Sequence, residues 1–399
     1  MNWINLKAGP AVIITSAFIG PGSLTVCALA GVDFGFELLW AVLLSCLITI
    51  FFQNIVANLS YHHNLGLIEL LKNKLNNKSL KVFFKYYILI TIFFGNAAYE
   101  AGNISGALLG LNNISEIILF ETSELFEPYL LLIITIFLIL VVLKDNIRLL
   151  KNVLGIAVML MSFSFLVAAI ITKPNLIDIL AGFFIPRWRP ETWSTIVAVL
   201  GTTIVPYNLF LHAWLVKKEK SNNISFKLLK RDTIIAVSFG GVISASIIIA
   251  ASGANIYELV SVEDLGTSLN NLYGNKSQLL ISFGLFAAGL SSAMTAPLAA
   301  RYVFKESINN YSNKFKLEIV APILIIFIGL IFTHFDTNPF NLIKVAQIAN
   351  GLMLPGITLF ILYLCLSFQP KTLNYKIRIL GLIILFLFFA FLAFKILFL

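Results

Sequence analysis

The stretch Gly20-Pro21-Gly22-Ser23 interrupts the first apolar segment of this 399-residue chain, and Val205-Pro206-Tyr207-Asn208 interrupts a later segment in the same way. A proline within a helix removes a backbone donor, and flanking glycines loosen the helix further. Lipid cannot satisfy the freed carbonyl groups, so a helix broken inside a membrane lines protein or a water-filled cavity. Two such breaks at matching places in two halves are the sequence pattern of a transporter binding site.

The composition indicates an integral membrane protein. Hydrophobic residues make up 59% of the chain and charged residues 12%, whereas soluble domains have about 25% charged residues. The net charge of +9 comes from Lys and Arg in short loops between apolar segments, which is typical of membrane topology rather than of a nucleic-acid partner. Cys27, Cys46 and Cys365 fall within apolar segments and form neither a metal-binding pattern nor a disulfide framework.

Eleven apolar segments approach or reach the length of about 20 residues that a membrane-spanning helix needs. They cover residues 8–31, 35–58, 85–111, 128–143, 152–172, 193–216, 233–254, 278–300, 319–334, 341–367 and 379–398. If the N-terminus is cytoplasmic, all but six of the 28 Lys and Arg fall on the inner side; the six are Lys173, Arg187, Arg189, Lys276, Lys344 and Lys395. This positive-inside bias supports the topology and places the C-terminus outside.

The first five segments and the next five form two halves of opposite orientation, and each half opens with a broken helix. We therefore predict an all-α integral membrane fold built as a 5+5 inverted repeat. Residues 1–175 form the first repeat, 176–370 the second repeat, and 371–399 an additional eleventh helix.

Glu100 is a carboxylate deep within an apolar segment. Placing a charge there costs at least about 2.5–3.5 kcal/mol on insertion scales, so such a residue normally faces a cavity and takes part in function. Asn96 and Asn103 share a helical face with Glu100, with Tyr99 beside them. We interpret Glu100, Asn96, Asn103 and His212 as coupling or gating residues; the alternative is a protonated glutamic acid that ties helices together by hydrogen bonds.

The two breaks carry neutral groups. Gly20-Pro21-Gly22 offers backbone alone and Ser23 adds a hydroxyl, while Thr202 and Tyr207 supply hydrogen-bonding groups at the second break. Backbone amides that open a helix attract anions. Divalent cations favour carboxylate, imidazole or sulfur ligands, and neither break contains Asp, Glu, His, Cys or Met.

These motifs resemble the natural-resistance-associated macrophage protein (NRAMP) family of divalent-metal transporters over essentially the whole chain. Gly9-Pro10-Ala11 followed by Phe18-Ile19-Gly20-Pro21-Gly22-Ser23 resembles the first-helix signature, and Val205-Pro206-Tyr207-Asn208-Leu209-Phe210-Leu211-His212 resembles the sixth-helix signature. Glu100 matches a third-helix glutamate, and Gln347 with Leu354-Pro355 matches the tenth helix. The resemblance implies a leucine-transporter-type fold, with helices 1 and 6 unwound at a central site and alternating access by secondary transport.

The sequence departs from the family at the residues that hold metal. The family's aspartate, asparagine, methionine, histidine and carbonyl-donating alanine are here Gly20, Ser23, Val205, Tyr207 and Thr202, and a third-helix aspartate is Ala97. One unit charge at about 4 Å and an effective dielectric near 20 is worth roughly 4 kcal/mol, enough to reverse a site's preference for charge sign. We therefore predict a secondary transporter of a small inorganic anion, with bicarbonate as the best fit. The resemblance also points that way, since related branches without metal ligands have been linked to bicarbonate.

We predict that the substrate-binding residues are Gly20, Pro21, Gly22, Ser23, Thr202, Val205, Tyr207 and Gln347. The alternative is an NRAMP-type transporter of Mn²⁺ or Mg²⁺ that binds a hydrated ion through Glu100, Gln347 and carbonyl groups. A sensor or membrane enzyme is disfavoured, because the sequence shows no nucleophile–base pair, nucleotide loop or metal triad. We expect no enzymatic activity, no cofactor and no nucleic-acid partner. The expected partners are the transported ion, H⁺ or Na⁺ as coupling ion, and the lipid of the inner (plasma) membrane.

Overall fold

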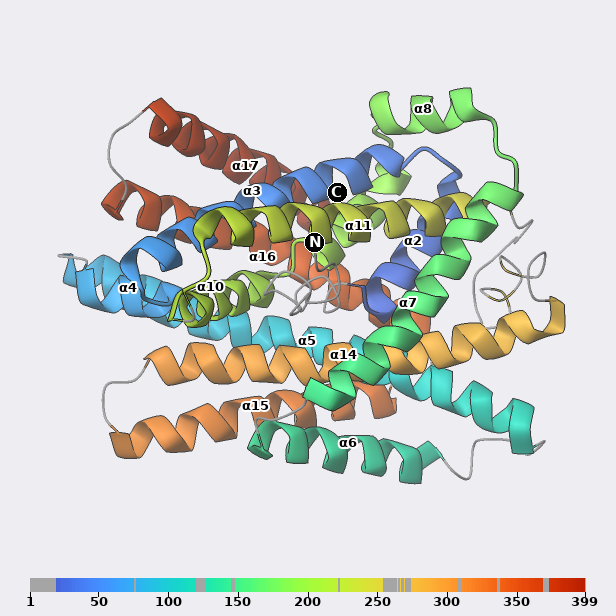
Figure 1. The fold of residues 1–399 in the computed structure, drawn as a ribbon, viewed down its shortest axis with the longest axis horizontal. Helices are drawn as coiled ribbons and strands as arrows, with labels where there is room; N and C mark the ends of the chain where they lie inside the picture. Colours follow the sequence, from blue (N-terminus) through green and yellow to red (C-terminus); the bar gives the residue numbers. More distant parts are fainter. Residues whose placement is uncertain are drawn as a thin grey trace.

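In a computed structural model, the described part of the chain is almost entirely helical (Figure 1). The structure describes residues 19–74, 77–119, 127–144, 148–221, 223–253, 274–307, 311–335, 338–368 and 373–398, together with 264, 266 and 269. The α-helices are α2 (Pro21–Phe34), α3 (Leu39–His63), α4 (Leu67–Lys74), α5 (Lys78–Leu119), α6 (Glu127–Lys144), α7 (Arg148–Ile171), α8 (Leu176–Phe184), α9 (Trp193–Thr203), α10 (Pro206–Ser221), α11 (Phe226–Ser252), α14 (Ser277–Ser307), α15 (Tyr311–Phe335), α16 (Pro339–Phe368) and α17 (Leu373–Phe398). The 3₁₀ turns η2 (Pro190–Thr192) and η3 (Gly274–Lys276) precede α9 and α14.

The described residues include 8 helical spans that are long and apolar enough to cross a membrane, judged by length and composition, and three shorter apolar helices. These spans correspond to the predicted apolar segments, and the prediction of an all-α membrane protein is confirmed. The predicted boundaries differ most at α5, whose 42 residues extend beyond the predicted 85–111 at both ends. Helical hydrogen bonding continues there into the polar residues that flank the apolar run.

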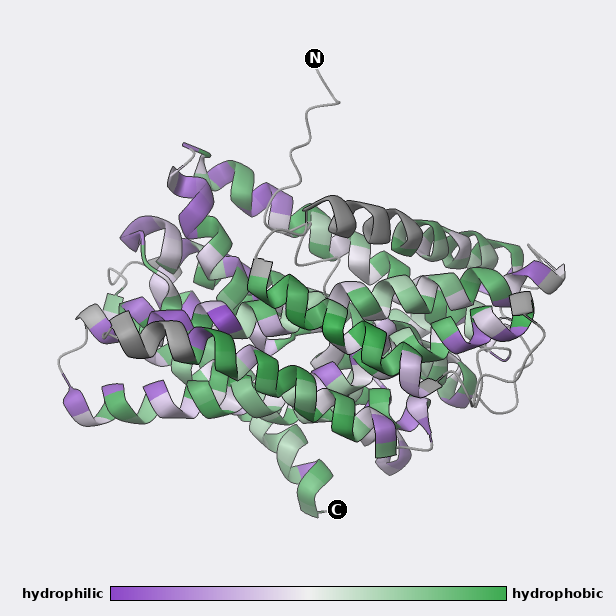
Figure 2. Ribbon diagram, turned by 90° about the horizontal axis from the view of Figure 1, so that it is seen from below, coloured by the Kyte–Doolittle hydropathy of each residue, from purple (hydrophilic) through white to green (hydrophobic). Residues whose placement is uncertain are grey.

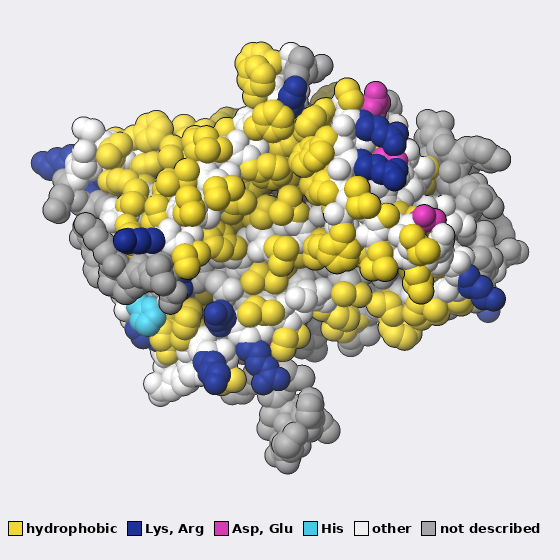
Figure 3. Space-filling model, turned by 90° about the horizontal axis from the view of Figure 1, so that it is seen from above, with side chains coloured by type: hydrophobic (Ala, Val, Ile, Leu, Met, Phe, Trp, Pro, Cys, Tyr) yellow, Lys and Arg dark blue, Asp and Glu magenta, His cyan; other side chains and the backbone are white. Residues whose placement is uncertain are grey.

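The outer surface has the composition of a surface that faces lipid. The helices are hydrophobic over much of their length and hydrophilic toward their ends (Figure 2). A broad band of hydrophobic side chains covers one face of the molecule, with Lys and Arg mostly toward its ends and edges (Figure 3). Leu132, Ile331 and Leu387 are among the large apolar side chains that are more than half exposed on this surface. A helix satisfies its own backbone groups, so such side chains can contact acyl chains without exposing polar backbone.

The centre of the bundle is built around α5, which runs beside α14 and α15 (Figure 1). Glycines allow the backbones of α5 and α14 to approach closely. A Cβ atom on Gly289 would lie 2.5 Å from the backbone nitrogen of Ala107. Asn96 adds a hydrogen bond across the same pair of helices, from its Nδ2 to the carbonyl of Ala296 at 2.8 Å. α5 and α14 therefore form a closely packed pair behind the broken segments.

The structure shows the second predicted break, and it shows a helix start at the position of the first. The segment predicted over 193–216 consists of two helices, because α9 ends at Thr203 and α10 begins at Pro206. α2 begins at Pro21, with Gly20 as its N-cap in an extended conformation (φ −113°, ψ −173°). The first half of the first predicted segment lies outside the described residues. The breaks occur where proline prevents continuation of the helical hydrogen bonds.

Aromatic and charged contacts join the helices at the two ends of the bundle. At the α4 end, Lys217 Nζ lies 2.5 Å from Glu69 Oε2, and the Trp214 ring stacks on Tyr302 with centroids 3.8 Å apart. Near α8, Arg187 and Arg189 both pair with Glu37, at 3.0 and 2.5 Å. α8 itself was not among the predicted segments, since its 9 residues are too few to span a membrane.

The three cysteines are free thiols buried inside the bundle, as their apolar surroundings in the sequence indicate. The exposed fractions are 1% for Cys27, 7% for Cys46 and 0% for Cys365.

Candidate functional site

The first break is closed by local hydrogen bonds of Ser23. Its hydroxyl donates to the carbonyl of Gly20 at 3.1 Å and accepts from the Gly20 amide at 3.1 Å. Leu24 also donates its backbone N–H to the Gly20 carbonyl, at 3.2 Å. The predicted role of Ser23 as a hydrogen-bonding group for substrate would therefore compete with its role in capping α2. Pro21 and Gly22 are buried beside it.

At the second break, the end of α9 and the start of α10 are buried inside the bundle. Ile204 donates its N–H to Leu200 at 2.8 Å, which completes the last turn of α9, and Thr49 of α3 contacts the Thr203 carbonyl at 3.4 Å. Asn208 donates its N–H to the carbonyl of Val205 at 3.1 Å. Val205 itself is 1% exposed and contributes an apolar side chain. The link between the two helices is thus short and fully enclosed.

Gln347 of α16 brings the two breaks together. A Cβ atom on Gly22 would lie 2.4 Å from Gln347 Nε2, and one on Gly201 would lie 1.9 Å from the Gln347 carbonyl oxygen. Glycine at both positions therefore lets the backbones of α2 and α9 contact this residue directly. The sequence-based prediction grouped Gln347 with the breaks, and the structure places it between them.

A group of hydroxyls lies against Gly20, where the related family has its aspartate. A Cβ atom at Gly20 would lie 2.6 Å from Ser292 Oγ of α14 and 3.7 Å from the Tyr99 hydroxyl of α5. The side chains of Tyr99 and Ser292 interact, and the Tyr99 ring packs edge-on against that of Tyr207 with centroids 5.4 Å apart. Ser292 was not among the predicted site residues, because the sequence around a serine inside an apolar run does not indicate which distant residues it contacts.

Several polar atoms of this buried centre have no hydrogen-bond partner among the described residues. They include Thr202 Oγ1 and Gln347 Oε1, whose residues are each 1% exposed. The Tyr207 hydroxyl is equally buried, and it interacts with the side chains of Tyr99 and Thr295. An unpaired buried hydroxyl or amide costs about 1–3 kcal/mol, so such atoms are generally satisfied by a ligand or by water. The three oxygens come from α9, α10 and α16, the elements that meet at the breaks. These oxygens are the candidate ligand-binding atoms of this region.

Glu100 interacts electrostatically with Tyr99 and Tyr207 of this region. Its stem packs against α15, since a Cβ atom on Gly329 would lie 2.9 Å from Glu100 Cγ. The residue is 0% exposed, and neither carboxylate oxygen has a hydrogen bond of ordinary geometry in the described part of the chain. Asn96 faces α14 instead, through its bond to Ala296. Asn103, one turn beyond Glu100, is also buried, and its side chain interacts with that of Glu100.

His212 lies one turn beyond the second break and bonds away from it. Its Nδ1 contacts Gln53 Oε1 of α3, and its Nε2 has no partner among the described residues. The described residues contain no group of three or more His, Cys, Asp or Glu that could hold a metal ion. The candidate site is therefore lined by neutral oxygen and nitrogen atoms, and a metal bound there would be held by oxygens and its own water.

Comparison with known proteins identifies a matching family and related sequences. A family model described as natural resistance-associated macrophage protein-like matches residues 11–399. The divalent metal cation transporter MntH of Bacillus subtilis is 28% identical over 360 residues, covering 85% of this chain and 79% of the relative. The MntH of Staphylococcus haemolyticus is 24% identical over 372 residues, covering 87% and 81%.

Solved structures agree on the fold. The Eremococcus coleocola manganese transporter, in complex with an aromatic bis-isothiourea compound, superposes with a TM-score of 0.73 at 18% identity, covering 96% of this chain and 85% of that chain. MhsT in complex with L-phenylalanine gives a TM-score of 0.58 at 17% identity, covering 97% and 98%. The expectation of a leucine-transporter-type fold is confirmed.

Proposed function

Because this chain belongs to the natural resistance-associated macrophage protein-like family of membrane transporters, we propose that it carries a divalent metal cation by alternating access. The protein is a multi-pass transporter and not an enzyme. The relatives that it matches over 85–87% of its length are named as divalent metal cation transporters, and this carries the proposal. Our sequence-based preference for an anion has no support in these relatives, which favour the alternative reading.

The neutral site still allows a cation to bind. Hard divalent cations take oxygen ligands that include carbonyl groups and water, and Mg²⁺ commonly keeps several waters. Thr202 Oγ1 and Gln347 Oε1 are two buried oxygens without partners in the described chain, and the buried Tyr207 hydroxyl, which interacts with Tyr99 and Thr295, is a third. The carbonyl groups at the end of α9 add further acceptors. We propose that a partly hydrated ion such as Mn²⁺ or Mg²⁺ binds among these oxygens.

A small oxyanion such as bicarbonate is the second candidate, and one observation favours it. Two described helices, α2 and α10, begin at the breaks, where their positive dipole ends favour negative charge. Neither break contains a carboxylate that would oppose that field.

Uptake into proteoliposomes separates the two candidates. Purified protein is reconstituted, and ⁵⁴Mn²⁺, Mg²⁺ and labelled bicarbonate are offered to parallel vesicles, with protein-free liposomes as the control. The Thr202→Val variant removes one oxygen of the site at nearly constant volume. Protein-dependent metal flux that falls in this variant supports the proposal. Bicarbonate flux without metal flux would overturn it in favour of the second candidate.

We further propose the plasma membrane as the location, with the N-terminus cytoplasmic and the C-terminus outside, on the basis of the Lys and Arg distribution. The inverted repeats over residues 1–175 and 176–370 would place one broken helix in each half. H⁺ or Na⁺ would be the coupling ion. Glu100 and His212, each buried with unpaired atoms in the described chain, remain the proposed protonation sites.

A further inference from the structure

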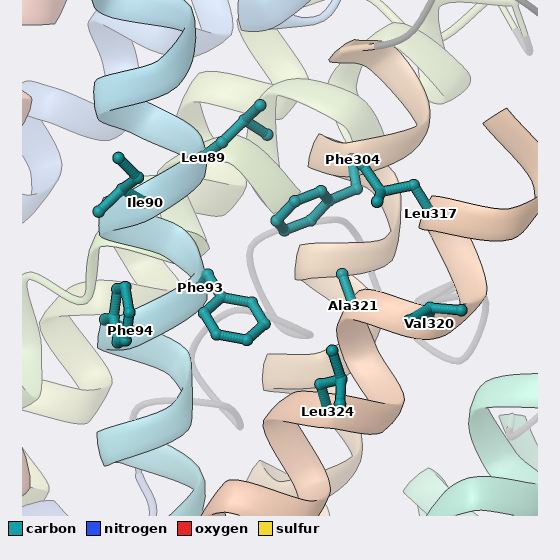
Figure 4. Close-up of a pocket in the computed structure, with 9 residues that line it drawn as sticks. All are labelled: Leu89, Ile90, Phe93, Phe94, Phe304, Leu317, Val320, Ala321 and Leu324. Carbon is teal, nitrogen blue, oxygen red and sulfur yellow. The ribbon is translucent and has the colours of Figure 1, made fainter. Parts of the chain in front are cut away.

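An apolar groove lies between α5, α14 and α15 on the outside of the bundle (Figure 4). Its volume is about 230 Å³, and every described residue that lines it is apolar. Phe93 of α5 and Phe304 of α14 extend from opposite sides toward the space between the helices (Figure 4). Ala321 and Phe304 form a buried floor, at 3% and 6% exposure, whereas Phe94 and Val320 on the rim are 59% and 46% exposed.

The groove lies on helices that are each long and apolar enough to span the membrane. Its open side is therefore continuous with the lipid-facing surface of the bundle, where apolar side chains contact acyl chains. A groove with a buried apolar floor and an exposed apolar rim has no group to hold water or a polar ligand. Its surface matches a hydrocarbon chain of the bilayer.

One end of the groove carries a positively charged cluster. Arg301 Nη2 and Lys305 Nζ of α14 lie 3.6 and 3.5 Å from the two carboxylate oxygens of Glu318 on α15. Two cations around one carboxylate leave a net positive charge. Glu318 is buried, but the side chain of Lys305 is 47% exposed, directly beside Phe304 at the groove end. Basic groups between spanning helices are typical binding points for anionic lipid head groups.

Residues of α5 indicate that the groove end next to Lys305 lies at the membrane surface. Tyr86 is 57% exposed, and Lys85 Nζ lies over its ring at 5.6 Å. Tyrosine and lysine at this depth are typical of the interface between lipid and water. Leu89, one turn further along α5, already lines the groove. An acyl chain in the groove thus ends at the level where a phosphate would meet Lys305.

We propose that this groove is a binding site for one anionic phospholipid, with an acyl chain between α5 and α15 and its phosphate on Lys305. The site holds α5, α14 and α15 together on their outer face. It does not depend on which ion the protein transports.

Native mass spectrometry of the purified protein tests this site. The protein is titrated with phosphatidylglycerol and with phosphatidylethanolamine of the same acyl chains. Lys305→Gln removes the exposed charge, and Ala321→Phe fills the floor of the groove. Lys276→Gln, at the other end of the span and exposed, is the matched control. A correctly folded state of each variant is checked by its melting temperature.

Phosphatidylglycerol should bind more tightly than phosphatidylethanolamine, and Lys305→Gln should weaken its binding about fivefold, as expected for one lysine near an anionic head group. Ala321→Phe should reduce binding of both lipids, while Lys276→Gln should leave it unchanged. Equal affinity for the two lipids, or equal loss in Lys305→Gln and Lys276→Gln, would overturn the proposal. If Ala321→Phe does not fold, the two lysine variants decide the question alone.

Discussion

Restoring a carboxylate at Gly20 tests the sign of the ion that the central site prefers. The extended backbone at Gly20 accepts any residue, but a Cβ atom there would lie 2.6 Å from Ser292 Oγ. Replacing Ser292 by alanine removes that oxygen, after which the nearest atoms are Ser292 Cβ at 3.5 Å and the Tyr99 hydroxyl at 3.7 Å. The double variant Gly20→Asp/Ser292→Ala therefore places a carboxylate beside Tyr99 without a clash at Cβ.

The size of the effect follows from the charge. With an ion about 4 Å from the carboxylate and an effective dielectric near 20, each unit charge is worth roughly 4 kcal/mol, or about a thousandfold in affinity. Desolvation of the buried carboxylate opposes this gain by several kcal/mol. We therefore expect at least about a tenfold tighter apparent affinity for Mn²⁺. A transported anion would instead be repelled, and its uptake should be lost.

The assay is concentration-dependent uptake into proteoliposomes, with Gly20→Asn/Ser292→Ala as the isosteric neutral control. The difference between the Asp and Asn variants isolates the charge from the change in volume. Tighter Mn²⁺ uptake in the Asp variant supports cation transport at this site. If the Asp and Asn variants transport both ions equally well, Gly20 does not lie next to the substrate and the reasoning from the break is refuted.

Three further variants test helix packing, the role of Glu100 and an ion pair. Gly106→Ala should destabilise the protein by about 1–3 kcal/mol, because a Cβ atom there would lie 2.4 Å from Pro21 Cβ; an unchanged melting temperature in detergent would show that α2 yields without cost. Glu100→Gln should flatten the dependence of transport on pH, whereas an intact pH profile would assign the carboxyl group a structural role. Lys217→Met removes the cation that pairs with Glu69, at 30% and 28% exposure, and that also lies near the buried Glu306. The loss of stability should therefore exceed the roughly 1 kcal/mol of an exposed pair; an unchanged melting temperature in detergent would count against an ionic contribution.

The breaks at Pro21 and Pro206 could be predicted because proline and glycine disrupt helical hydrogen bonds within their own turn, which is a local effect. The apolar spans could be predicted for a similar reason, since the length of a hydrophobic run is a local property. α8 was not predicted, although Asn175 caps it through a bond to the Ile177 amide at 3.0 Å. A short apolar stretch between two membrane spans is compatible with a short helix and with a loop, and the sequence does not distinguish them.

The composition of the site depended on contacts between distant segments. Ser292 and Tyr99 meet at Gly20 because α14 and α5 pack behind α2, which no periodicity in the sequence indicates. The direction of Glu100 is set by the closeness of Gly329 on α15, so its distance from the breaks could not be read from helical spacing alone. Ser23 was predicted as a substrate-binding residue of the break, whereas the hydroxyl bonds that the structure shows are local to the helix cap.

The burial of all three native thiols makes the natural sequence suited to site-directed labelling. Cys27, Cys46 and Cys365 lie inside the bundle, where a water-soluble maleimide does not reach them. A single cysteine introduced at an exposed position, such as Lys276 or Lys305, would then carry a fluorophore or spin label in an otherwise unaltered chain. Movements of the two ends of the bundle during a transport cycle can therefore be followed without first building a cysteine-free background.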